Sequence, residues 1–180
     1  REHMRGRGDF EQVLRDAREG LDTIGAERSA AYQRGMEKVW ASKADLDIVP
    51  IKQAADDAVA SVMYNGRPLV DDAEMAAINR ARDAVEQWAA DFDHTPASFD
   101  ALKRRLDAVT PDNPMHSQAR RVISLMKTSV KNAVEKAVPE YRQALNDYSA
   151  SKGLTKEIER TLSLGPNAAA DTGLRKLQSI

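Results

Sequence analysis

The sequence predicts an all-α protein: an elongated helical bundle, or antiparallel coiled-coil-like helices, with about five or six helices in total. Apolar residues recur every three or four positions along most of the chain, which is the spacing of one helix face. Proline, glycine and capping residues separate these stretches, and no stretch alternates with the period of two that is typical of strands. Aromatic residues make up only 5% of the chain, so we expect thin helix-on-helix seams.

Composition excludes several classes of protein. The chain has 180 residues, enough for one domain with a core or for two small ones. It contains no cysteine, which rules out disulfides, a thiol nucleophile and zinc–thiolate sites. No apolar run approaches the roughly 20 residues that a membrane-spanning helix needs, and no secretory signal is visible. We therefore expect no transmembrane segment.

The N-terminal part predicts a flexible start at residues 1–8, because Gly6 and Gly8 interrupt it. His3-Met4 is typical of a cloning scar, although native chain inside a larger protein fits equally well. Asp9 is the expected N-cap of a first helix that runs to about Lys43. The apolar face of this helix consists of Phe10, Leu14, Ala17, Leu21, Ile24, Tyr32, Met36 and Val39.

Three further helices are expected before residue 110, so that residues 9–110 form an N-terminal helical unit. Asp47 and Pro50 mark the start of one helix, and Asn65-Gly66 supplies the left-handed residue that ends it. Asp71 or Asp72 is expected to cap the next helix. Thr95-Pro96 combines a cap with a first-turn proline and opens a short helix. The loop Thr110–Pro114 is the expected boundary between two packing units.

The longest apolar stripe lies in residues 115–164, which predict one long helix or a kinked helix pair. The stripe comprises Ala119, Val122, Met126, Val130, Ala133, Ala137, Tyr141, Ala144 and Tyr148. Pro139 lacks a backbone donor and clashes with the preceding turn, so the helix should kink or restart there. Gly165-Pro166 should stop it, and residues 165–180 should form a linker and a short terminal helix with Leu174, Leu177 and Ile180 on one side.

No catalytic, cofactor-binding or metal site is predicted. Asp56, Asp57, Asp71, Asp72 and Glu74 could together bind a hard cation, but helix capping and solvation explain them better. The histidines His3, His94 and His116 are isolated and lack a second histidine at ligand spacing. No nucleophile motif and no phosphate-binding loop is present.

Basic residues raise a second interpretation, a helical module that contacts nucleic acid. The net charge is −1, but residues 117–180 carry 11 Lys or Arg against 6 Asp or Glu. Lys103-Arg104-Arg105 and Arg120-Arg121 are the densest basic sites, and Tyr141 and Tyr148 share a helix face on which bases could stack. Tyrosines seven residues apart more often belong to a helix–helix seam, and the charges of both signs interleave. We therefore rank this interpretation second.

Two stretches resemble a known family. Val138–Ser149 and Ala169–Ile180 are similar to segments of large helical virion proteins of tailed bacteriophages and prophages, including internal or ejected proteins. In those proteins a segment like Thr95–Asp107 precedes them, so the resemblance covers about residues 95–180. It implies a fragment of a larger phage protein located in the virion, or in the cytoplasm before a prophage product assembles.

The resemblance also implies the partners and the role. The partners would be other copies of the chain and other virion proteins, with weak DNA contact as a further option. The role would be assembly within the particle, or passage into the host envelope during genome delivery. We expect a structural, non-enzymatic domain without cofactors or a small-molecule substrate. The alternatives are the nucleic-acid module, which would use basic residues in 103–136, and a non-catalytic region of a larger phage enzyme.

Overall fold

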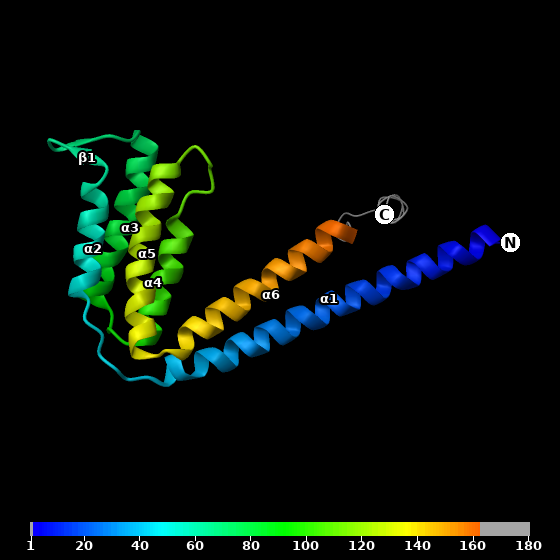
Figure 1. Ribbon diagram of the computed structural model, residues 1–180. Coiled ribbons are helices and arrows are strands. Elements are labelled where there is room, and N and C mark those ends of the chain that lie inside the picture. The colour runs from blue at the N-terminus through cyan, green and yellow to red at the C-terminus, as the bar shows by residue number, and fades with distance from the viewer. Residues whose placement is uncertain (1, 163–180) are drawn as a thin grey trace. The chain divides into compact units, whose positions relative to one another are not determined.

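The computed structural model describes residues 2–162 and confirms the all-α class (Figure 1). The elements in chain order are α1 (Glu2–Ala41), α2 (Val49–Ala60), β1 (Met63–Tyr64), β2 (Arg67–Pro68), α3 (Asp72–Asp91), α4 (Pro96–Val109), α5 (Ser117–Ala137) and α6 (Glu140–Leu162). The linker and terminal helix expected at residues 165–180 lie outside the described residues. The chain forms two compact units, of which the second is Glu37–Tyr141.

This second unit is a bundle in which α2, α3, α4 and α5 run alternately up and down, joined by short connections (Figure 1). Helix α5 packs against all three of the others. The side chains that fill the core are almost fully buried: Ile51, Ile78, Val85, Phe99, Leu102, Leu106, Val122, Ile123, Met126, Val130 and Val134. They recur at helical spacing, and each contributes about 1.5–3 kcal/mol of hydrophobic stabilisation relative to exposure.

Two of the predicted helix starts have the expected capping hydrogen bonds. Asp71 accepts from the backbone N–H of Glu74 at 2.7 Å. Thr95 accepts from the N–H of Ser98 at 3.3 Å, and a proline follows it as the first helical residue. The start expected at Asp9 is wrong, because α1 already begins at Glu2. Glycine costs a helix only about 1 kcal/mol per residue, which does not suffice to end it.

Asn65 and Gly66 have a different role from the one predicted. Both have positive φ, 48° and 73°, and they form the turn between the short antiparallel strands β1 and β2. Two consecutive left-handed residues are what a two-residue hairpin turn of this type requires. Helix α2 has already ended at Ala60. The expectation of no strand therefore fails for this one small hairpin.

Pro139 divides the predicted long helix into two. Helix α5 ends at Ala137 and α6 begins at Glu140. Val138 between them is extended, with φ −134° and ψ 90°, as expected for the residue before a proline. The structure thus has the kinked pair rather than one continuous helix, whereas Gly153 lies inside α6 without interrupting it.

The first unit contains α1 up to Met36 and α6 from Arg142. The two helices approach closely at Gly35 and Ala144, where a Cβ on Gly35 would lie 2.6 Å from the Cβ of Ala144. The rings of Tyr32 and Tyr148 follow, 5.1 Å apart. Further along the same contact, the Arg28 guanidinium lies 5.4 Å from the Tyr148 ring centroid.

This division into units differs from the one expected at Thr110–Pro114. That loop lies inside the second unit, because α4 and α5 on either side of it share one core. The expected N-terminal unit of residues 9–110 is likewise divided, since most of α1 groups with α6 from the other end of the chain. Contacts between helices far apart in sequence decide this grouping.

Candidate interaction surface

Four of the acidic residues considered as cation ligands have structural or solvent-exposed positions. Asp71 caps α3, and Asp56 forms a 2.9 Å ion pair with Arg82. Asp57 accepts a side-chain hydrogen bond within α2, and Asp72 is exposed in the first turn of α3. No group of three or more metal-ligating residues occurs in the part of the chain that the structure describes.

Glu74 has a role that sequence reasoning missed. Its side chain is 7% exposed, and its Oε1 accepts from the backbone N–H groups of Gln118 and Ala119, each at 3.1 Å. A carboxylate from α3 thus caps the N-terminus of α5, where unpaired N–H groups and the helix dipole favour a negative charge. The sequence signal for this role was the position of Glu74 on its helix, because Glu74 falls on the same face as the buried Ile78 and Ala81.

The histidines do not converge on a site. The backbone carbonyl of His94 accepts from the N–H of Leu46 at 2.8 Å, and its ring lies 5.9 Å from that of Phe99. Its Nε2 is buried without a hydrogen-bond partner in the structure. His116 is the residue that precedes α5. The side chain of His3 lies outside the part that the structure describes.

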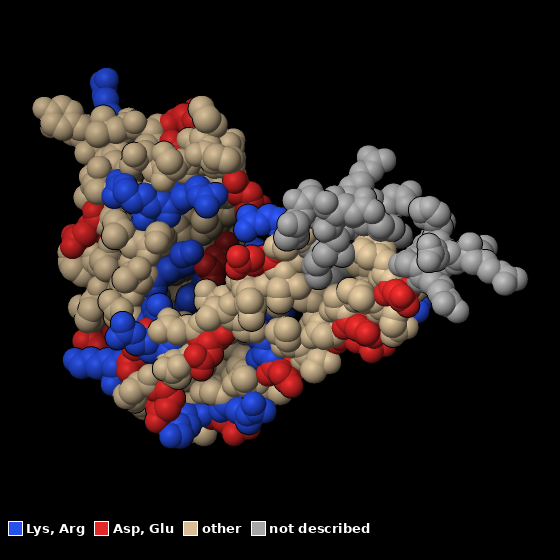
Figure 2. Space-filling model, turned by 45° about the vertical axis from the view of Figure 1, so that its right-hand side comes forward, with Lys and Arg blue, Asp and Glu red and all other residues tan. Residues whose placement is uncertain are grey.

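Most of the basic residues considered for nucleic-acid binding are occupied within the protein. Lys103 and Lys127 both contact Asp107, at 3.4 and 2.8 Å. The guanidinium of Arg120 donates to two loop carbonyls, and that of Arg121 donates to the hydroxyl of Ser61 at 3.2 Å. Figure 2 shows that basic and acidic residues intermingle on the visible face. These cations do not form an uninterrupted track for phosphates.

The Asp107 carboxylate is the centre of one of these charge clusters. Partial burial raises its pKa, but the hydrogen bond from Lys127 and the charges of Lys103 and Lys127 outweigh this effect. The pKa of Asp107 therefore lies below its ordinary value. The hydrogen bond from Lys38 likewise lowers the pKa of Glu140 below its ordinary value.

Stacking of nucleic-acid bases on both tyrosines would require a free ring face on each of them, and neither tyrosine presents one. Tyr141 is fully buried, and its hydroxyl donates to Asp100 Oδ1 at 2.8 Å. Tyr148 is half-buried and contacts Tyr32 and Arg28. The seam interpretation therefore describes both tyrosines better than base stacking does.

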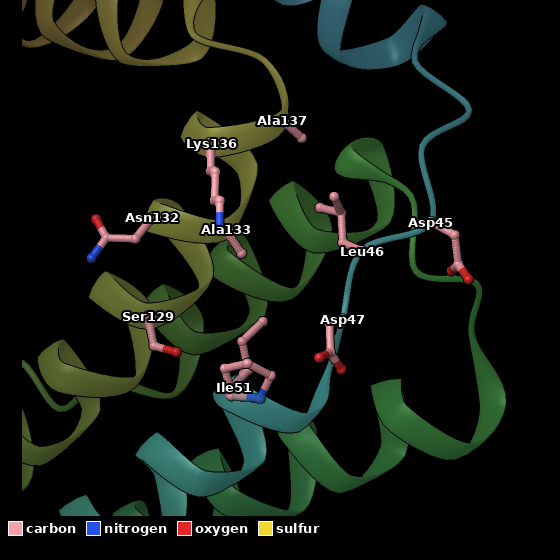
Figure 3. Close-up of a pocket in the computed structure, with 10 residues that line it drawn as sticks. Asp45, Leu46, Asp47, Ile51, Ser129, Asn132, Ala133, Lys136 and Ala137 are labelled. Carbon is pink, nitrogen blue, oxygen red and sulfur yellow. The ribbon is translucent and has the colours of Figure 1, made fainter.

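An open groove of about 770 Å³ lies between α5 and the linker that leads into α2 (Figure 3). We call it the α2/α5 groove. Its lining residues are Asp45, Leu46, Asp47, Pro50 and Ile51 on one side, and Ser129, Asn132, Ala133, Lys136 and Ala137 on the other. The residues from α5 are spaced three and four apart, so they form one helix face. The volume falls within the range of about 300–1,000 Å³ that is typical of ligand sites.

The groove combines an apolar floor with charges at its rim. Ile51 is almost fully buried, and Figure 3 shows Leu46 pointing from the linker toward the α5 side. Asp47 lies beside Ile51 and uses one carboxylate oxygen to accept from the N–H of Val49 at 3.0 Å. Among residues 8–161, whose side chains the structure describes, neither Asp45 nor Lys136 forms an ion pair. Sequence reasoning missed this groove, since its two sides are about 80 residues apart.

The comparisons with known proteins place the chain in no group: no family model, no curated protein and no solved structure matches it. None of the helices described here is both long enough and apolar enough to cross a membrane.

Proposed function

We propose that this chain is a helical assembly domain of a tailed-bacteriophage or prophage virion protein, which acts through protein–protein contacts and has no enzymatic activity. The α2/α5 groove is the observation that carries the assembly role. It offers an apolar lining of Leu46 and Pro50 above the buried Ile51, beside Asp45 and Lys136, which form no ion pair among the described side chains. An apolar centre with a polar rim is the usual anatomy of a protein docking surface.

The chemistry of the groove supports docking over catalysis. Acid–base catalysis needs titratable groups within hydrogen-bond reach of one reacting atom. The groove contains no histidine, and in Figure 3 Asp45 points away from α5, which carries Lys136. These features fit a groove that binds an apolar segment of a protein partner better than a groove that holds a reacting substrate. A murein-degradation assay on the purified chain tests this point, because any turnover would overturn the non-enzymatic role.

The phage context rests on the resemblance of Val138–Ser149 and Ala169–Ile180 to virion proteins. The test is immunodetection of this domain in purified particles before and after triggered genome release, with a capsid protein as the loading control. Signal that is lost with the genome identifies an ejected protein, which is delivered into the host envelope. Signal retained in both samples identifies a fixed component. Absence from both samples would overturn the proposal.

A further inference from the structure

We propose that the α2/α5 groove of one copy binds residues 168–180 of a second copy. This inference rests on the proposed assembly function and deepens it, because it names the two surfaces that meet. The donor and acceptor surfaces are different, so the contact is head-to-tail. Repeated contacts of this kind close into a ring or extend into a filament.

The acceptor surface is built from short side chains on α5 facing longer apolar ones. Ser129, Ala133 and Ala137 follow one another at intervals of four residues, which lets another backbone come close to α5. Leu46 and Pro50 supply the accessible apolar wall on the opposite side, above the buried Ile51. This arrangement suits a short segment with apolar residues at intervals of three or four, which is the helix-in-groove mode of recognition.

The two sides of the groove carry opposite charges at the rim. Asp45 and Asp47 carry negative charge on the linker side, and Lys136 carries positive charge on the α5 side. Some charges elsewhere in the bundle are paired, as in Arg82 with Asp56 at 2.9 Å, whereas Asp45 and Lys136 form no ion pair among the described side chains. An occupant that presents a cation to the linker and an anion to α5 would form ion pairs on both sides of the groove.

Residues 163–180 lie outside the described part of the chain, but their sequence has this combination of features. Leu174, Leu177 and Ile180 recur every three residues. The basic pair Arg175-Lys176 lies between the first two of them, and Asp171 precedes it. The leucines would cover Leu46 and Pro50, the basic pair would meet the linker carboxylates, and Asp171 would meet Lys136.

The binding test uses the full chain and a fluorescein-labelled synthetic peptide of residues 168–180, followed by fluorescence anisotropy. We expect saturable binding that an unlabelled peptide competes away. Asp47→Lys in the chain should weaken binding at least about tenfold, since it replaces an attractive contact by a repulsive one. Asp57→Lys is the matched control, because Asp57 is an exposed acid of α2 outside the groove, and it should bind normally.

A charge exchange keeps the test independent of folding defects. The Asp47→Lys chain should regain affinity for a peptide that carries Arg175→Glu and Lys176→Glu, which a misfolded chain would not do. Sedimentation of the full chain should show association that rises with concentration and is lost when Leu174→Ser and Leu177→Ser are introduced together.

Three results would overturn the inference. The first is no peptide binding, and the second is binding that Asp47→Lys leaves unchanged. The third is a concentration-independent monomer that binds peptide only after its own Leu174 and Leu177 are replaced, since the segment would then occupy the groove of its own copy. A positive particle immunodetection would leave the broader assembly role standing in each case.

Discussion

The hydroxyl of Tyr141 donates a 2.8 Å hydrogen bond to Oδ1 of Asp100, a residue 41 positions earlier in the chain. Both residues are buried, and the other carboxylate oxygen of Asp100 lies 3.3 Å from Nε of Arg104. A buried carboxylate needs such partners because it has lost its hydration. This bond fixes the first turn of α6 to α4 within the bundle.

Replacing Tyr141 by Phe should lower the free energy of unfolding by about 1–3 kcal/mol, because a buried carboxylate oxygen loses a donor while the ring is kept. Urea denaturation followed by circular dichroism measures the change. Tyr148→Phe is the matched control, with an expected effect below about 0.5 kcal/mol. Equal effects of the two substitutions would contradict a special role for the bond to Asp100.

Glu74→Ala should destabilise the bundle by about 1–3 kcal/mol, since it removes the acceptor for two backbone N–H groups at the start of α5. Amide hydrogen exchange should accelerate most at Gln118 and Ala119, and denaturation gives the free energy. Gln87→Ala, at an exposed position of the same helix, should change stability by less than about 0.5 kcal/mol. Unchanged exchange at the start of α5 would show that the cap is dispensable.

Gly35→Ala and Gly20→Ala should have opposite effects on thermal stability. At Gly20 a Cβ meets nothing within 4 Å, so alanine should stabilise α1 by up to about 1 kcal/mol through its helix propensity. At Gly35 the Cβ would come within 2.6 Å of Ala144, and overpacking of about 1–3 kcal/mol should exceed that gain.

The reciprocal variant checks the Gly35 contact directly. Combining Gly35→Ala with Ala144→Gly should recover stability relative to the sum of the two single variants, as a double-mutant cycle measures. Strictly additive changes in the free energy of unfolding would show that the side chains at the two positions do not interact sterically.

Asp107 should make stability depend on acid pH. Its folded pKa is lowered from the ordinary 3.8, so the unfolded state binds more protons in this range. The stabilisation is complete above the unfolded value and is lost as the pH falls through the folded value. It should stay below about 1 kcal/mol, since the side chain is 46% exposed.

Comparing the wild type with Asp107→Asn by urea denaturation tests this expectation. The stability difference should be present near about pH 6 and shrink below about pH 4, where the carboxyl becomes protonated. Replacing Lys103 and Lys127 by Gln together should abolish this loss of stability toward acid pH, because only partial burial, which raises the pKa of Asp107, then remains. A difference that grew toward acid pH would contradict the assigned sign.

DNA should not bind measurably at about 50 mM salt, a condition that favours phosphate contacts. The reason is that Arg120 and Arg121 are engaged with protein acceptors. A gel-shift titration with duplex DNA measures this. Tight, salt-dependent binding that weakened on replacing both arginines by Ala would favour the nucleic-acid module instead.

The sequence by itself determined the helical class, the helix starts at Asp71 or Asp72 and at Thr95, and the break at Pro139. These features depend on local physics. A capping side chain reaches a backbone N–H three residues away, a proline ring clashes with its own preceding turn, and apolar spacing shows which face is buried. Each acts within one or two helical turns, so a single sequence contains the information.

Only the tertiary structure decided which helices share a core and where a surface forms. Glu74 caps α5 by accepting from the backbone N–H of Gln118, 44 residues later in the chain. The grouping of α1 with α6 and the two sides of the α2/α5 groove also join segments far apart in the chain. Long-range packing selects these contacts from many that are compatible with the same helices, because amphipathic faces are alike in chemistry and differ chiefly in shape.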